Sequence, residues 1–149
     1  MNQPRYEEMM SSLRSIRAYL SSISQIQQEI DLLVYDMENV KAIRYDKEPM
    51  HTPESVKEEH RLDQIEQKAE IERELDMTLL AYRTVRDKCI LLLMNQDELI
   101  REVLLDRFGL ELIAGEFSVH GKILTYEELG DLYGYTSQGL YSKIKREIK

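Results

Sequence analysis

The side chains with the clearest potential for chemistry lie in the last fourteen residues of this 149-residue chain. That segment has four Lys or Arg and one acid, a charge of 4 − 1 = +3, on a chain whose net charge is −8. Cations neutralise phosphates, whereas hydroxyl and amide groups form hydrogen bonds with base edges. The segment is therefore a candidate contact with double-stranded DNA. Its expected contact residues are Thr136, Ser137, Gln138, Tyr141, Ser142, Lys143, Lys145 and Arg146.

Catalytic and metal-binding chemistry finds little support in the sequence. At most one of the three histidines, His51, His60 and His120, has a cysteine or carboxylate beside it at the spacing of a zinc site. Phosphate-binding loops, dinucleotide-binding glycines and the usual hydrolase motifs are missing. Glu127 and Glu128 form an acidic pair, but helix capping accounts for Glu128. We expect no enzyme activity, no catalytic residue, no metal and no cofactor.

The candidate contact residues need a rigid support, and the sequence predicts two short helices there. Thr125 followed by Glu128 is a capping box, in which each side chain bonds to the backbone of the other residue at the start of a helix. Gly134 can adopt the left-handed conformation that turns a chain, and Thr136 can cap the next helix. Two helices joined by a short glycine-containing turn form a helix-turn-helix.

The apolar spacing predicts how these two helices pack. Leu129 and Leu132 are expected to point inward from the first helix, and Gly130 leaves room for a close crossing by the second. Tyr141 has two possible roles, since it neighbours an apolar residue and can pack its ring in the core while its hydroxyl reaches out. The apolar residues of the second helix recur every four positions and are Leu140, Ile144 and Ile148.

Two blocks of the C-terminal third resemble region 4 of the primary sigma factors. The first is the V-L-L-D-R-F-G-L stretch of residues 103–110, and the second is the T-Y-E-E-L-G stretch of residues 125–130 followed by Tyr135 and Thr136. They occur in the order that region 4 has, over residues 99–149. This resemblance implies a module that binds promoter DNA in the major groove and docks on RNA polymerase.

The upstream two thirds is similar to the ArpU and RinA type of phage late-gene transcriptional regulators, a family related to sigma factors. The similarity comprises a long helical arm, the A-I-R-Y-D stretch of residues 42–46 before a proline-containing break, an acidic second helix, and a terminal pattern of Tyr135, Thr136, Leu140 and Tyr141. It implies a phage or prophage transcription regulator that works in the cytoplasm of a bacterial host.

The first 94 residues are expected to form an arm of two long helices. Apolar residues three or four apart predict a first helix over about residues 5 to 44, with Ser11, Ser12, Ser21 and Ser22 among the residues of its outer face. A break is expected over Tyr45 to Pro53. The inward stripe of the first helix comprises Leu13, Ile16, Leu20, Ile23, Ile26, Ile30, Leu33, Met37 and Val40.

The second arm helix is expected to begin with Thr52 as its N-cap and Pro53 as its first residue. Its acid-rich part between Glu54 and Asp76 is typical of a solvated face. The two stripes can be buried by an antiparallel hairpin or by dimerisation, and the sequence leaves both open. The inward residues expected on the second helix are Leu62, Ile65, Ala69, Leu75, Leu79, Tyr82, Val85 and Cys89.

A third helix is predicted to start with Asn95 as its cap and to end at Gly109. The helical period is then lost until Leu124, and the residues between Gly115 and Gly121 are typical of extended chain, such as a small hairpin. Cys89 lies beside an apolar run and is expected to be a core residue, with no disulfide. The fold class is thus all-α, with an arm over residues 1–94 and a helix-turn-helix domain over residues 95–149.

The N-terminus has no signal segment and no apolar stretch is long enough for a membrane span, so a soluble cytoplasmic protein is expected. Two functions remain open. The first is a regulator that engages promoter DNA, host RNA polymerase, or both, with a homodimer formed through the arm as a further expected partner. The second is a protein-interaction factor that acts through its acidic arm. A net charge of −8 and the replacement of base-reading arginines by Ser137, Gln138 and Gly139 favour the second. The two blocks that resemble sigma region 4 favour the first.

Overall fold

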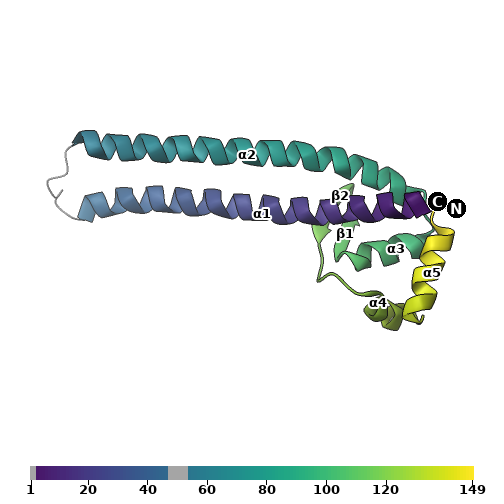
Figure 1. Ribbon diagram of the computed structural model, residues 1–149. Coiled ribbons are helices and arrows are strands. Elements are labelled where there is room, and N and C mark those ends of the chain that lie inside the picture. The colour runs from purple at the N-terminus through teal and green to yellow at the C-terminus, as the bar shows by residue number, and fades with distance from the viewer. Residues whose placement is uncertain (1–2, 47–53) are drawn as a thin grey trace. The chain divides into compact units, whose positions relative to one another are not determined.

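The computed structural model describes the backbone of residues 3–46 and 54–149 and the side chains of residues 3–39 and 58–149. This part of the chain is mostly helical, with five helices and one two-stranded sheet (Figure 1). The expected all-α class therefore holds apart from a small hairpin. In chain order the elements are α1 (Gln3–Asp46), α2 (Glu54–Met94), α3 (Glu98–Arg107), β1 (Leu110–Ile113), β2 (Glu116–Val119), α4 (Tyr126–Tyr133) and α5 (Ser137–Glu147).

Contacts group the chain into two compact units. The arm unit is Ser21–Leu80, and the head unit is Met1–Leu20 with Ala81–Lys149. This grouping differs from the expected division into residues 1–94 and 95–149. The reason is that the first turns of α1 and the last turns of α2 supply buried side chains to the C-terminal elements.

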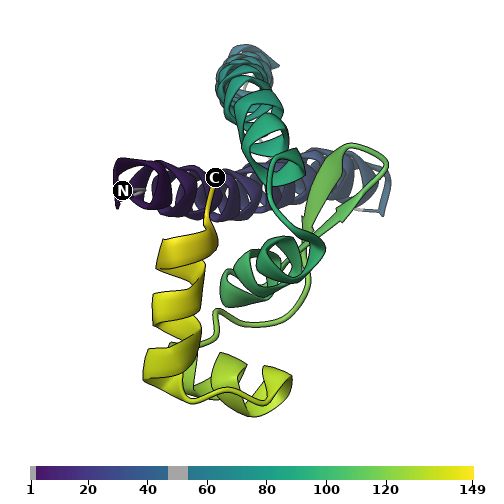
Figure 2. The same cartoon turned by 90° about the vertical axis from the view of Figure 1, so that its right-hand side faces the viewer.

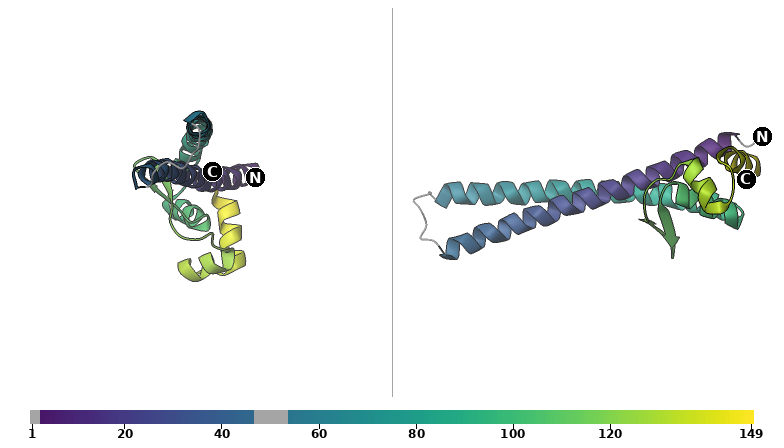
Figure 3. Two further views of the ribbon diagram at one scale, coloured as in Figure 1. Left: turned by 90° about the vertical axis from the view of Figure 1, so that its left-hand side faces the viewer. Right: turned by 90° about the horizontal axis from the view of Figure 1, so that it is seen from below.

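In the arm unit, α1 and α2 run in opposite directions (Figures 1 and 3). Ile26 and Ile30 are 6% and 8% exposed, which confirms their expected place on the inward stripe. Helix α1 includes Tyr45 and Asp46, so the expected break begins too early. The rest of the break, with the expected capping pair Thr52 and Pro53, lies outside the described residues.

The inward face of α2 differs from the expectation in the arm unit. Leu62 and Ile65 are 54% and 48% exposed, and Ala69 is exposed as well, so their interior placement was wrong. The less exposed apolar residues of α2 in this unit are Ile71, Leu75 and Leu79, of which Leu75 and Leu79 were expected. The physical reason is that an amphipathic pattern with two apolar faces does not say which of them faces the neighbouring helix.

The head unit holds most of the buried apolar side chains. Ser12, expected on the outer face of α1, is buried at 7% exposure, so that expectation was wrong. Cys89 is fully buried, as expected. Every element of the head unit contributes to this core, whose apolar members are Met9, Met10, Leu13, Ile16, Tyr82, Cys89, Leu92, Leu93, Ile100, Val103, Leu104, Phe108, Leu110, Phe117, Leu129, Leu140, Ile144 and Ile148.

Strands β1 and β2 confirm the expected extended chain between α3 and α4. They pair antiparallel, with Leu110 opposite Val119 and Ile113 opposite Glu116, and the tight turn uses Gly115 at a φ of 78°. The start of α3 corrects the expectation at Asn95, because the N-cap is Asp97, whose side chain makes no capping hydrogen bond. Only residues 95–97 connect α2 to α3, and only residues 108–109 connect α3 to β1. These short connections keep α3 close to the end of α2 and to the hairpin.

Candidate nucleic-acid interface

The capping box at the start of α4 is present as predicted. The Thr125 hydroxyl accepts a hydrogen bond from the backbone N–H of Glu128 at 3.2 Å, and the Glu128 carboxylate accepts one from the backbone N–H of Thr125 at 3.3 Å. Lys122 lies 2.9 Å from the same carboxylate. Its hydrogen bond, followed by that from Thr125, lowers the pKa of Glu128. The start of α4 is therefore fixed by polar contacts on both sides.

The turn between α4 and α5 depends on two glycines. Gly134 has a φ of 80°, the left-handed conformation that was predicted. At Gly130 an added Cβ would lie 2.5 Å from the Tyr135 carbonyl oxygen, so the close approach is made by the turn rather than by α5 itself. Leu129 is buried as expected, but Leu132 is 64% exposed, so its inward placement was wrong. An eight-residue helix with a tight turn buries only part of its apolar surface.

Helix α5 carries the eight candidate contact residues or their cap. The Thr136 hydroxyl accepts from the backbone N–H of Gly139 at 3.0 Å, which confirms the predicted cap. The three apolar residues predicted to face inward are buried, and they turn the opposite side of α5 outward. On that side Gln138, Ser142 and Arg146 are exposed. Ser137 is exposed at the first position of the helix, and we call these four residues the α5 edge.

The other candidates on α5 are engaged with the protein itself. Lys143 is ion-paired with Glu147 at 2.9 Å, and the side chains are 23% and 33% exposed. Lys145 donates to the Tyr141 hydroxyl at 2.9 Å, and its Nζ lies over two rings, 4.8 Å from the centroid of Tyr141 and 5.3 Å from that of Tyr6. The structure thus brings the predicted residues onto one helix and its cap, and of them it leaves the α5 edge and Thr136 exposed.

Three tyrosines from different elements meet beside Lys145, and we call them the tyrosine cluster: Tyr6 of α1, Tyr126 of α4 and Tyr141 of α5. Tyr141 packs edge-on against Tyr126 at 5.2 Å and against Tyr6 at 6.0 Å. The hydroxyls of Tyr6 and Tyr126 are hydrogen-bonded, and burial is the main cause that raises the pKa of Tyr6. Figure 2 shows α5 beside the N-terminal end of α1.

This cluster answers the open question about Tyr141, since its ring packs inside while its hydroxyl meets Lys145. Tyr6 and Tyr126 were not predicted as site residues, because residues 120 positions apart leave no local signal of their contact in the sequence.

A second contact between α1 and the C-terminal elements was also missed. The Arg17 Nη1 donates to the carbonyl oxygens of Phe108 at 2.8 Å, Gly109 at 3.1 Å and Gly121 at 2.9 Å. Gly109 has a φ of 60°, and an added Cβ there would lie 2.6 Å from the same nitrogen. One guanidinium therefore fixes the chain on both sides of the hairpin and, through it, the approach to α4.

The end of α5 is held by Gln96, in the turn between α2 and α3. Its side chain donates to the Lys149 carbonyl at 2.8 Å and accepts from the Lys149 N–H at 2.9 Å, and it is 4% exposed. A buried amide that satisfies both backbone groups of one residue fixes that residue firmly. Both ends of α5 are thus anchored to the head unit.

The acidic charge of the chain is unevenly distributed. Residues 21–80 contain seven Lys or Arg and fifteen Asp or Glu, and 7 − 15 = −8 equals the net charge of the whole chain. The head unit is therefore neutral overall. The net charge is an argument against phosphate binding by the arm unit, but it is not an argument against phosphate binding by the head unit.

Comparison of the chain with protein-family models, with curated proteins and with solved structures finds no match. In the part of the chain that the structure describes, no three His, Cys, Asp or Glu side chains are placed to hold a metal ion. Over the same residues, no helix has both the length and the apolar character that crossing a bilayer requires.

Proposed function

We propose that this chain is a phage or prophage transcription regulator in which α4 and α5 form a sigma region 4-like helix-turn-helix that engages promoter DNA, host RNA polymerase, or both. The observation that carries the proposal is the α5 edge. Its hydroxyl, amide and guanidinium groups face solvent on a helix whose start is capped by Thr136 and whose end is held by Gln96. A rigid helix with such an outward face has the form that enters a major groove.

The side chains of the α5 edge determine which groups of DNA it can bind. Gln138 can pair with adenine through two hydrogen bonds, and the hydroxyls of Ser137 and Ser142 can bond to either strand. Arg146 is 72% exposed and can reach a phosphate or a guanine. Because Arg146 is the one cation among these four side chains and also lies 3.9 Å from the Glu147 carboxylate, binding by one head unit is weak and gains specificity from a second site or from the polymerase.

A salt titration of the full chain on random duplex DNA tests the proposal. Binding that weakens steeply as salt rises indicates phosphate contacts, and Arg146→Ala is expected to reduce the slope of log K against log salt by about 1. The matched control is Arg61→Ala, which removes the same charge from the arm unit and should leave the slope unchanged. The absence of binding at low salt would refute DNA contact by the α5 edge.

The second candidate function is a protein-interaction factor that acts through the acidic arm unit. The specific observation in its favour is that the entire net charge of −8 lies in residues 21–80. Two candidate cations, Lys143 and Lys145, are also engaged internally. A partner captured from host lysate equally well by wild-type protein and by Arg146→Ala, with no DNA affinity in either, would favour this function over the first.

A further inference from the structure

Lys145 of α5 lies on the same face of its helix as two residues of the α5 edge. Gln138, Ser142 and Lys145 are four and three residues apart, a spacing that places successive side chains above one another on a helix. The Gln138 side chain donates to the Ser142 hydroxyl at 3.5 Å, in keeping with this alignment. A Lys145 side chain extended along this face would therefore add a second cation to the α5 edge.

The half-buried Lys145 side chain turns instead to the tyrosine cluster. Its ammonium donates to the Tyr141 hydroxyl at 2.9 Å and lies 4.8 Å and 5.3 Å from the ring centroids of Tyr141 and Tyr6. The two rings are 6.0 Å apart and nearly perpendicular, so the ammonium lies in the corner between them. Aromatic faces attract a cation, and this attraction competes with that of a phosphate. Because Tyr6 belongs to α1, the cover on Lys145 depends on where the first turns of α1 lie.

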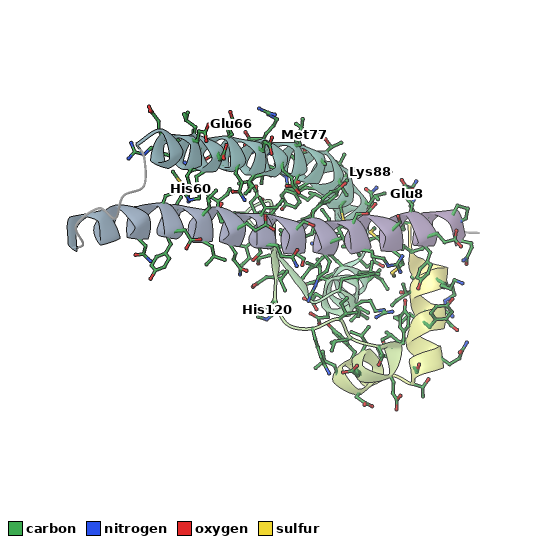
Figure 4. All side chains as sticks on the ribbon, turned by 60° about the vertical axis from the view of Figure 1, so that its left-hand side comes forward. Glu8, His60, Glu66, Met77, Lys88 and His120 are labelled. Carbon is green, nitrogen blue, oxygen red and sulfur yellow. The ribbon has the colours of Figure 1, made fainter. Side chains whose placement is uncertain are left out.

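The segment of α1 that carries Tyr6 is lightly attached to the rest of the head unit. Residues 3–5 and 7 are exposed, and the buried side chains of α1 begin at Met9. Glu8 forms an ion pair with Lys88 of α2 at 3.2 Å, and Figure 4 shows these two side chains next to each other. They are 37% and 59% exposed, and an exposed ion pair stabilises a fold little. Because helix ends open at a low cost in free energy, residues 3–8 can separate from α5 while the buried core stays intact.

Lys143, the other cation of α5 with an internal partner, is held differently. Its partner Glu147 lies on α5 itself at 2.9 Å, so this ion pair does not depend on α1. Lys143 is two residues from Lys145, about 200° around the helix, and therefore lies on a different face. A movement of the first turns of α1 thus frees Lys145 and leaves Lys143 paired.

We propose that the first two turns of α1 are an autoinhibitory cover on a second phosphate contact of α5. Tyr6 holds Lys145 away from DNA, and separation of residues 3–8 from α5 frees Lys145 to bind a phosphate. A lysine suits this role, because its ammonium on a flexible four-carbon stem can reorient without movement of the backbone. The inference rests on the proposed contact between α5 and DNA and adds regulation to it. A partner that holds the start of α1 away from α5 would raise the affinity of the head unit for DNA.

Amine labelling of the full chain, with the rate at Lys145 read by mass spectrometry, tests the cover without DNA. Tyr6→Ala and Tyr6→Phe both lack the hydroxyl, and only the second keeps the ring over Lys145. We expect labelling of Lys145 to be about fivefold faster in Tyr6→Ala than in Tyr6→Phe, the ratio that loss of one cation–π contact gives. Cys89 should stay unreactive in both, which shows that the core is intact; if Tyr6→Ala exposes it, Tyr6→Leu takes its place. Equal labelling rates would overturn the cover.

A salt titration of DNA binding by the same variants tests the consequence. The slope of log K against log salt should be steeper by about 1 in Tyr6→Ala than in Tyr6→Phe, which corresponds to about 3.5-fold more affinity lost between about 50 and 200 mM salt. Adding Lys145→Gln to Tyr6→Ala should abolish this gain. Lys143→Gln, which removes the same charge from the same helix, should leave the gain in place.

The two levels of the proposal fail in different ways. If none of these proteins binds DNA at low salt, the proposed function itself is refuted, and the regulation with it. If DNA binds with equal slopes in Tyr6→Ala and Tyr6→Phe, or if the gain persists after Lys145→Gln, the cover alone is overturned and the contact between α5 and DNA stands.

Discussion

Replacing Arg17 by Met tests how the C-terminal elements are attached to α1. The substitution keeps the aliphatic stem but removes the nitrogen that donates to the carbonyls of Phe108, Gly109 and Gly121. A hydrogen bond to a charged group contributes about 1.5–3 kcal/mol, and one nitrogen with two hydrogens makes two strong bonds at most. Because Arg17 is only half-buried, water partly replaces the lost bonds. We expect Arg17→Met to lower the free energy of unfolding by about 2–3 kcal/mol.

Urea unfolding followed by circular dichroism measures the total effect, and hydrogen exchange locates it. Amides of residues 108–124 should exchange faster in Arg17→Met, while those of the arm unit keep their wild-type rates. The matched control is Arg14→Met on the same helix. Arg14 is exposed, and its guanidinium lies 6.0 Å from the ring centroid of Phe108, a contact that contributes about 0.5–1 kcal/mol.

Arg17→Lys separates the contribution of the planar guanidinium from that of its positive charge. A lysine at this position keeps the positive charge but lacks the planar guanidinium, so it should recover about half of the lost stability at most. If Arg17→Met cost no more than Arg14→Met, or if faster exchange extended evenly over the whole chain, the three carbonyl contacts would not be what holds the hairpin.

Three further predictions concern the turn, the cap and the thiol. Gly130→Ala should lower the free energy of unfolding by about 1–3 kcal/mol, because its Cβ would lie 2.5 Å from the Tyr135 carbonyl oxygen. A thermal melt measures this, and an unchanged midpoint would show that the turn adapts. The hydrogen bond from Lys122 holds the pKa of Glu128 below its ordinary value of 4.5, so the ionised carboxylate stabilises the fold above pH 4.5 and this contribution is lost as pH falls through the folded-state pKa. Glu128→Gln should therefore lose less stability than wild type on acidification, and equal losses would contradict this. Burial raises the pKa of Cys89 to about 12, so a thiol reagent should label it only after denaturant is added, and rapid labelling of folded protein would refute its burial.

Local patterns predicted the C-terminal helices well. Thr125, Gly134 and Thr136 each act through atoms within a few residues, so a capping box, a left-handed turn and an N-cap are visible in the sequence and are present in the structure. The same holds for the strands around Gly115, which need only a tight turn between two short extended segments. Asp97 rather than Asn95 caps α3, an error of two residues that is typical where several polar residues precede a helix.

Expectations that depend on distant partners were less accurate. Leu62 and Ile65 have the spacing of an inward stripe, but which face of α2 turns inward is decided by α1, and they are exposed. The inward placement of Leu132 failed for a similar reason, since α4 is too short for both of its leucines to reach the core. The sequence identified α5 as the candidate site, but it gave no sign that Tyr6 covers Lys145.

The position of the Arg17 guanidinium has an evolutionary consequence. A side chain at Gly109 would need the space that the Arg17 nitrogen occupies, and the carbonyls around Gly109 and Gly121 would lose their donor if residue 17 changed. Selection therefore acts on residues 17 and 109 together, and in diverging descendants these two should be inherited or replaced as a pair. Such co-variation would identify, from sequences alone, descendants that join the hairpin to the first helix in the same way.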